Sequence, residues 1–197
     1  MMIVKHGGET ETRVVDQFEA TDLGTPFKVV LHDAVKVTYD KAGNAVSYAI
    51  PDLDGLLKVI VINRVLHPLR FSGGDVRFIR KAIDLKQKDL ASVIEVSPEH
   101  LSRCENGALP MSPSSEKLMR VFALKTALKL HKLKDCEAKT KLEDALDKIF
   151  EVLKPVAVRD AAEQIELHFS RKRRDPDQRS DGGEDDGPWD GDLAKAA

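Results

Sequence analysis

Three helix-start signals in the middle of the chain constrain its fold more than any other feature of the sequence. Ser72 precedes Asp75 by three residues, which is typical of a capping box, and Ser97-Pro98 and Ser112-Pro113 each place a capping residue before a proline. Asn106-Gly107 is a helix-stop signal. Because these signals follow one another closely, residues 71–125 are predicted to form short helices joined by tight turns.

The apolar residues between these signals recur at helical spacing. We predict one short helix after Ser72, a second from Gln87 to Ile94, a third from Ser97 to about Glu105, and a fourth that begins at Ser112. The turn between the second and third helices is very short. The apolar residues that form the helical stripes are Val76, Ile79, Ile83, Leu90, Ala91, Ile94, Val96, Leu101, Leu118, Val121, Phe122 and Leu128.

Such a set of helices is a platform that can hold one exposed helix in the major groove of DNA, which is about 12 Å wide. The residues Leu85 to Ala91, Val96 to Arg103 and Glu105 to Gly107 closely resemble the Cro/CI-type (Xre) helix-turn-helix family. The resemblance covers residues 71–125. It implies a transcription regulator whose partner is double-stranded DNA. The alternative is a helical bundle that makes only protein contacts.

The resemblance also implies which side chains meet the DNA backbone. Gln87 begins the second helix and corresponds to the family's backbone-contacting glutamine, and Lys88 follows it. Ser97 lies at the N-terminus of the reading helix, where its hydroxyl can donate to a phosphate beside backbone amides that favour anions.

Four residues of the third helix are the expected base-reading group. Glu99, His100 and Arg103 fall where the family reads bases, and Ser102 can reach either a base or the backbone. An alternative for Arg103 is a surface ion pair with Glu99, four residues earlier on the same helix.

Three residues depart from the family pattern. Lys86 stands where a capping residue is usual, and Cys104 replaces an aromatic residue. Glu95 replaces the glycine of the turn, where a positive φ would cost a non-glycine residue about 1–2 kcal/mol. None of these departures removes a group that faces DNA.

The N-terminal part of the chain is predicted to be a small α+β unit. Residues 27–32, 34–39 and 45–50 have strand patterns, and the turn residues 40–44 predict a hairpin. Apolar residues at helical spacing then run from Leu53 to Pro68. The predicted fold class is α+β: a strand-and-helix unit at 25–70, a helix-turn-helix domain at 71–125, and C-terminal helices. Residues 1–24 are expected to be a flexible arm.

The wider segment 27–125 resembles the MqsA-type subgroup of these regulators, in which a zinc-bearing N-terminal unit precedes the helix-turn-helix. The zinc cysteines of that subgroup are missing, because the two cysteines of this chain are Cys104 and Cys136. We therefore expect no metal and no cofactor. The resemblance leaves a toxin protein as a second possible partner.

The C-terminal part is predicted to contain an amphipathic helix from Leu142 to Leu153, within a helical extension over 126–170. This helix is the candidate dimer interface. A short strand is expected at 165–169. Residues 171–197 are predicted to be a disordered tail that starts with a basic run, 171–174.

Charge and composition narrow the functional classes. The net charge is −2, but residues 175–197 hold eight acidic residues against Arg179 and Lys195, and the rest of the chain holds 29 basic against 25 acidic residues. No apolar run approaches the roughly 20 residues of a membrane helix. No enzyme motif is present. We expect a cytoplasmic homodimeric regulator, most simply a repressor; the alternative is an antitoxin that binds a toxin and autoregulates its operon.

Overall fold

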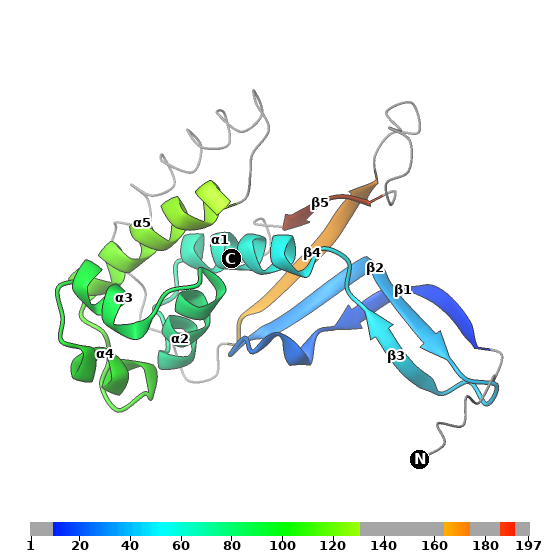
Figure 1. The fold of residues 1–197 in the computed structure, drawn as a ribbon, viewed down its shortest axis with the longest axis horizontal. Helices are drawn as coiled ribbons and strands as arrows, with labels where there is room; N and C mark the ends of the chain where they lie inside the picture. Colours follow the sequence, from blue (N-terminus) through cyan, green and yellow to red (C-terminus); the bar gives the residue numbers. More distant parts are fainter. Residues whose placement is uncertain (1–9, 131–163, 174–185, 192–197) are drawn as a thin grey trace, which may run out of the picture.

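The structure is a computed structural model that describes residues 10–130, 164–173 and 186–191. Strands precede and follow a run of five helices, so the predicted α+β fold is confirmed (Figure 1). The elements are β1 (Glu11–Glu19), a 3-10 turn η1 (Thr21–Leu23), β2 (Lys28–Tyr39), β3 (Ala45–Ala49), α1 (Leu53–Leu66), α2 (Gly73–Ala82), α3 (Gln87–Val93), α4 (Pro98–Glu105), α5 (Pro113–Leu130), β4 (Glu166–Arg173) and β5 (Asp186–Gly191).

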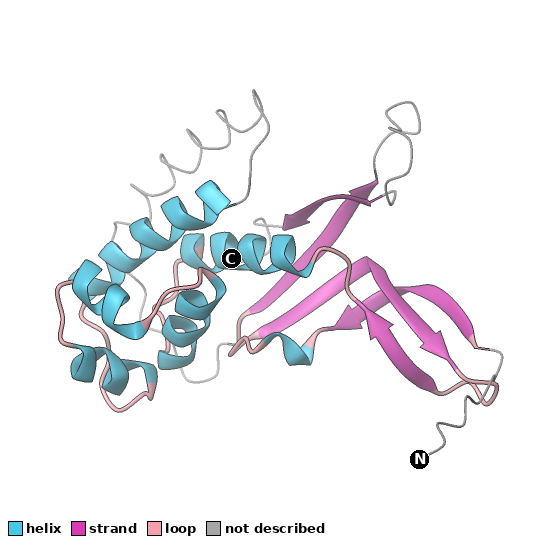
Figure 2. Ribbon diagram, viewed as in Figure 1, coloured by secondary structure: helices cyan, strands magenta, loops and turns pink. Residues whose placement is uncertain are grey.

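The described strands form one sheet around β2, the longest of them (Figure 2). Strand β1 pairs antiparallel with β2 along most of its length. On the other edge of β2, the N-terminal end pairs in parallel with β4 and the C-terminal end pairs antiparallel with β3. Strand β5 extends the sheet beyond β4. Residues from both ends of the chain therefore build the sheet, and the helices α1 to α5 lie between them in sequence.

Two strands were expected at 27–32 and 34–39, but residues 28–39 form the single strand β2. Asp33 interrupts its alternation with a φ of 51°, and the register with β1 shifts opposite it, between Val15 and Gln17. Aspartate tolerates this left-handed conformation better than most residues, so the strand continues past the irregularity. The predicted hairpin is confirmed: β2 and β3 pair antiparallel on either side of residues 40–44.

Two predictions about the ends of the chain were wrong. Residues 11–19, expected within a flexible arm, form β1, in which Val15 and Phe18 pack against the core. Residues 186–191, expected to be disordered, form β5, in which Trp189 is only 4% exposed. Strand β1 pairs with β2 and β5 pairs with β4, the neighbouring described strands in the chain, but the polar composition of both segments hides their strand character. The short strand expected at 165–169 is confirmed by β4.

Two further predictions concern the C-terminal helices and the apolar stripe of α5. The helix at 142–153 and most of the extension at 126–170 lie outside the described residues. The apolar stripe of α5 is not wholly buried, because Leu118 and Val121 are 48% and 39% exposed. Helix α5 turns Met119, Ala123 and Leu124 inward instead.

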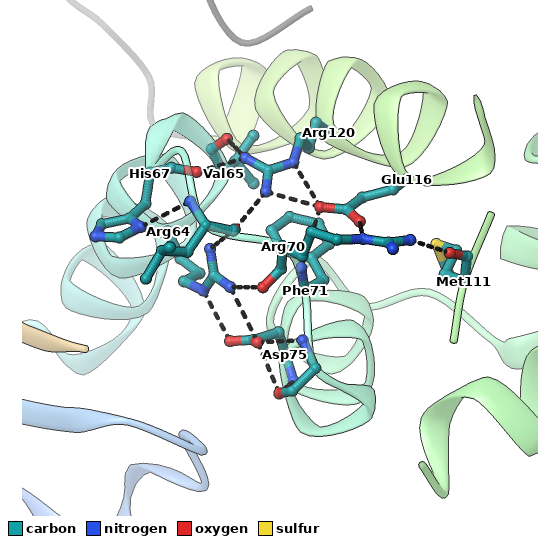
Figure 3. A network of polar contacts seen from close by, with 11 residues as sticks. Arg64, Val65, His67, Arg70, Phe71, Asp75, Met111, Glu116 and Arg120 are labelled. Carbon is teal, nitrogen blue, oxygen red and sulfur yellow. Dashed lines mark hydrogen bonds and ion pairs between the residues drawn. The ribbon is translucent and has the colours of Figure 1, made fainter. Parts of the chain in front are cut away.

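A buried polar network holds α1, α2 and α5 together (Figure 3). The guanidinium of Arg64 on α1 donates to both carboxylate oxygens of Asp75 on α2, at 2.8 and 3.0 Å, and both side chains are fully buried. Asp75 also completes the capping box of α2 by accepting from the backbone N–H of Ser72 at 2.6 Å. The predicted cap therefore also anchors α2 to α1.

Arg120 of α5 extends this network to the end of α1. Its guanidinium donates to the carbonyl oxygens of Val65, His67 and Leu69, at 2.7, 2.6 and 2.7 Å. It also pairs with Glu116 one turn earlier, at 2.8 Å. These bonds satisfy carbonyl groups that the end of α1 leaves without helical partners. Helices α2 and α5 are thus fixed to α1 by many directional bonds.

Candidate nucleic-acid interface

Helices α3 and α4 form the expected pair of short helices joined by a tight turn. Ser97 caps α4, because its hydroxyl accepts the backbone N–H of His100 at 3.1 Å. Glu95, in the turn, has a φ of 56°, the left-handed conformation that glycine adopts without strain. Lys86 precedes α3 in extended conformation and makes no side-chain cap.

Helix α4 presents two distinct sides. Leu101 and Cys104 are buried, at 0% and 2% exposure, and fix the inner side to the core. Glu99 and Arg103 are exposed, and His100 and Ser102 are half-buried. The four residues expected to read bases therefore remain accessible on a helix whose other side is held in the core. Gln87 is half-buried, and Lys88 and Ser97 are exposed.

A buried carboxylate clamps the three helices of this region. Glu105, the last residue of α4, is 5% exposed and binds Arg80 of α2 through two bonds of 2.6 and 3.0 Å. The same carboxylate accepts a bond of 3.1 Å from the side-chain amide of Gln87 at the start of α3. Arg80 also donates to the carbonyl oxygen of Leu85, at 2.9 Å. One ion pair thus sets the positions of α2, α3 and α4 relative to one another.

The clamp also orients the Gln87 side chain. An amide nitrogen carries two hydrogens, and Glu105 uses one of them. The bond places the nitrogen, and not the oxygen, on the Glu105 side. The second hydrogen stays available to a phosphate oxygen, which can only accept. This arrangement suits the backbone role expected for Gln87.

The segment after α4 is fixed by contacts to α2 and to the residues before it. Gly107 follows the helix with a φ of 74°, and Arg77 of α2 hydrogen-bonds the side-chain oxygen of Asn106. A Cβ atom at Gly73 would collide with the carbonyl oxygen of Cys104, so α2 and α4 approach each other there as closely as a glycine allows. Arg70 donates to the carbonyl oxygen of Met111 at 2.6 Å, which holds the connection to α5.

The charges at this surface are mixed. The backbone N–H of Glu99 and the hydroxyl of Ser97 hold the pKa of Glu99 below its ordinary value, so its carboxylate is ionised at neutral pH and can accept bonds from base amino groups. Lys86 and Lys88 at the start of α3 and Arg103 on α4 are exposed cations. The alternative ion pair of Arg103 with Glu99 does not form in the part of the chain that the structure describes, so the Arg103 guanidinium keeps its donors for another partner.

Cys104 is a packing residue. It is 2% exposed, and burial raises the pKa of its thiol. A buried neutral thiol is a poor nucleophile and a poor metal ligand.

Sequence reasoning missed Arg80 and Arg70 as residues that hold the interface. A signal was present for Arg80, because a charged residue at an inward position of a short amphipathic helix needs a buried partner. In the sequence, Glu105 marks only the end of the third predicted helix and the start of the family-like run Glu105 to Gly107. The pattern of helices along the chain does not indicate that Arg80 and Glu105 contact each other.

Within the described ranges, no three His, Cys, Asp or Glu side chains are grouped so that they could hold a metal ion. None of the described helices has the length and apolar character needed to cross a membrane.

Comparison with known proteins bears on the middle of the chain. Residues 76–127 match the family model described as Helix-turn-helix (HTH_3), which is about a quarter of the chain. No curated protein and no solved structure matches. The match spans most of α2 and all of α3 and α4, the helices that the Glu105 clamp joins. Residues 76–127 therefore form a helix-turn-helix domain that is similar to this family, the kind of domain found in DNA-binding transcription regulators.

Proposed function

We propose that this protein is a sequence-specific DNA-binding transcription regulator that acts as a repressor. The observation that carries the proposal is the geometry of α4: one side is locked by Leu101, Cys104 and Glu105, and the other leaves Glu99 and Arg103 exposed without an ion pair between them in the described structure. A rigid helix with free donors and acceptors loses little conformational entropy when it enters the major groove.

In this proposal, some side chains contact the edges of the bases and others contact the phosphates. Arg103 can donate two bonds to the O6 and N7 atoms of guanine, a contact that discriminates against other bases by about 1–3 kcal/mol. Gln87, Lys88 and Ser97 lie at the N-terminal ends of α3 and α4, where contacts with phosphates fix the register of the protein on the duplex. Glu99, His100 and Ser102 supply the remaining contacts with base edges.

Selection of bound sequences from random DNA by the purified full-length protein tests this function. The proposal predicts a recovered motif, protected from nuclease by the protein, that binds much more tightly than random DNA. For a repressor, the motif placed across a promoter should reduce transcription when the protein is added. Binding of all sequences with equal affinity would contradict the assignment.

We also propose that the protein binds as a homodimer. One helix of eight residues reaches only a few base pairs, and related domains bind two half-sites about one helical turn apart. The candidate interface, residues 142–153, lies outside the described residues. Replacing both Ile149 and Phe150 with Asp should give a folded monomer by light scattering, and an unchanged dimer mass would place the interface elsewhere.

An antitoxin role is the second candidate. The sheet unit lies outside the matched segment 76–127 and exposes the apolar side chains of Val46 and Tyr48 on β3, at 56% and 45%. Reading DNA does not require such a surface, whereas binding a toxin would. If a small protein encoded beside this chain stops growth when expressed alone, co-expression should restore growth, and Val46→Asp should prevent the rescue without changing DNA binding. Failure of co-expression to restore growth would remove this candidate.

A further inference from the structure

The outer side of α5 exposes a pair of large apolar side chains. Leu118 and Val121 are 48% and 39% exposed, and Phe122 beside them is half-buried. Residues three apart are neighbours on a helix surface, so Leu118 and Val121 adjoin each other. Among the described helices, α5 alone exposes two large apolar side chains, since α1 and α3 expose one each. The described residues leave this side of α5 uncovered.

Helix α5 cannot bury this pair by rotating about its axis. Met119, on the inner side, is fully buried. The carboxylate of Glu116 accepts the backbone N–H of Phe71 at 3.0 Å, and Arg120 donates to carbonyl oxygens at the end of α1. Rotation would break these bonds and expose Met119. Any cover for the outer side therefore has to approach α5 from outside.

The chain leaves α5 at its C-terminal end and returns at a point that a short series of contacts joins to its N-terminal end. The carbonyl oxygen of Ile165 accepts the backbone N–H of Lys28 at 3.2 Å. Pro26, two residues before Lys28, touches the start of α2, since a Cβ atom on Gly74 would lie 2.7 Å from it. The segment just before α2 is in turn bound by Glu116 in the first turn of α5.

Residues 131–163 have to connect these two points, and they include the amphipathic helix that the sequence predicts at 142–153. A helix of twelve residues is about 18 Å long, which equals the rise of α5 from Leu118 to Leu130. Two antiparallel helices joined by a loop are a common way to reverse a chain. A helix at 142–153 that runs antiparallel to α5 would both return the chain and lie along the exposed side.

The charges of the two segments are complementary. Lys117 is half-buried and Lys125 is exposed on α5, whereas the acidic Glu116 is buried and already paired with Arg120. Residues 142–153 carry four acidic residues and one lysine. Opposite charges that flank an apolar contact between helices favour their pairing. The lysines of α5 therefore favour this acidic segment as the cover.

The apolar stripe of residues 142–153 is wide enough for this contact and for a second one. At 100° per residue, its seven apolar residues cover about 160° of a helix, whereas roughly 100° is enough to face one core. Contact with α5 would leave apolar positions for a second copy of the chain. The contact is therefore compatible with the homodimer proposed above.

We propose that residues 142–153 of the same chain bind along the outer side of α5 and cover Leu118 and Val121. The occupant is fixed by the return of the chain, by the matching lengths and by the opposite charges. This inference concerns one copy of the chain, so it rests neither on DNA binding nor on the homodimer.

Cross-linking of the full-length protein with a carbodiimide, which joins amines to carboxylates in direct contact, tests the occupant. Equal amounts of ¹⁵N-labelled and unlabelled chains are unfolded in urea, mixed and refolded together. Lys117 or Lys125 should be joined to acidic residues of 142–153, and both peptides should carry the same label. Absence of these cross-links overturns the proposal. Cross-links between labelled and unlabelled peptides also overturn it, because they identify a second copy as the occupant.

The reactivity of introduced thiols tests the cover itself. Val121→Cys on α5 and Val93→Cys on α3 are matched, because the two valines are 39% and 38% exposed. Alkylation is followed by peptide mass spectrometry, which separates each new thiol from Cys104 and Cys136, and each rate is divided by the rate in urea-unfolded protein. Val121→Cys should react about tenfold more slowly than Val93→Cys, because the reagent has to wait for the cover to open. Equal rates overturn the proposal.

A substitution within the segment shows whether residues 142–153 provide the protection. Leu146→Asp, in the middle of the apolar stripe, should raise the rate of Val121→Cys to that of Val93→Cys, because burial of an unpaired carboxylate is costly. Lys148→Asp, on the polar side, is the matched control and should leave the protection intact. Protection that survives Leu146→Asp means that another element covers α5, which overturns the proposal. If Leu146→Asp does not fold, the cross-links and the comparison of the two thiols decide the matter.

Discussion

At the scale of single residues, the turn before α4 keeps a backbone conformation that its side chain does not favour. Glu95 has a φ of 56° in the position where the Cro/CI-type family has glycine. A residue with a Cβ atom pays about 1–2 kcal/mol for this conformation, whereas glycine adopts it freely. The turn geometry is therefore kept even though the favoured residue is absent.

Glu95→Gly should raise the free energy of unfolding by about 1 kcal/mol, because the relief of strain is partly offset by the greater freedom of glycine in the unfolded chain. Asp84→Gly is the matched control, since Asp84 has a φ of 54° but aspartate tolerates this region better. Urea unfolding of both variants measures the difference. Equal effects of the two substitutions would contradict the strain assigned to Glu95.

Asp75 makes stability depend on pH. Burial alone would raise its pKa, but the hydrogen bonds and charge of Arg64 and the bonds from Ser72 hold the pKa below its ordinary value. An aspartate with a lowered folded-state pKa contributes stability above its unfolded pKa of about 3.9, and the contribution is lost as the pH falls through the folded-state value.

Asp75→Asn should lower the free energy of unfolding at pH 7 by about 3–5 kcal/mol, because Arg64 stays buried without a counter-charge. The variant should also lose less stability than the wild-type protein when the pH falls from 5 to 3. Urea unfolding at several pH values checks both results, with the exposed Asp54→Asn as control. A variant with wild-type stability at pH 7 would show that the buried pair has no such role.

At the scale of elements, the helices carry local start and stop signals, whereas β1 and β5 carry no clear strand pattern. Ser72 and Ser97 cap α2 and α4 as the sequence indicated, because a cap depends on residues three positions away. β1 and β5 pair with the neighbouring described strands β2 and β4, but their polar composition does not mark them as strands. The exposed side of α4 could be predicted because its apolar pattern is local. The clamp of Arg80 and Gln87 on Glu105 joins three helices, so no local pattern indicated it.

The buried side chain of Trp189 connects strand β5 to the start of α1. Trp189→Ala should lower the free energy of unfolding by about 3–5 kcal/mol, the usual cost of removing a large buried aromatic side chain. Trp189→Phe loses both hydrogen bonds to the start of α1 but keeps an aromatic ring in the core. It should therefore lower the free energy of unfolding by less than Trp189→Ala does. Urea unfolding followed by circular dichroism compares the two. An alanine variant as stable as the wild-type protein would mean that β5 does not stabilise the fold.

At the scale of the whole molecule, one framework joins the sheet unit to the helix-turn-helix domain. Arg64 and Arg120 bind α1, α2 and α5 together, and both guanidinium groups lie over the ring of Phe71, 4.8 and 4.2 Å from its centroid. Glu105 at the end of α4 then binds Arg80 of α2 and Gln87 of α3, which fixes α3 and α4 to α2. Helix α4 is thus positioned by the whole fold.

The central claim is that α4 reads DNA, and comparing Arg103→Ala with Gln87→Ala in a binding selection from random DNA tests it most directly. Arg103→Ala should relax the preference at one base pair in each half-site and bind the wild-type motif more weakly by a factor that corresponds to about 1–3 kcal/mol, with little change on random DNA. Gln87→Ala should weaken binding to all sequences without changing the preferred motif. If Arg103→Ala selects the same motif with the same affinity as the wild-type protein, α4 is not the reading helix.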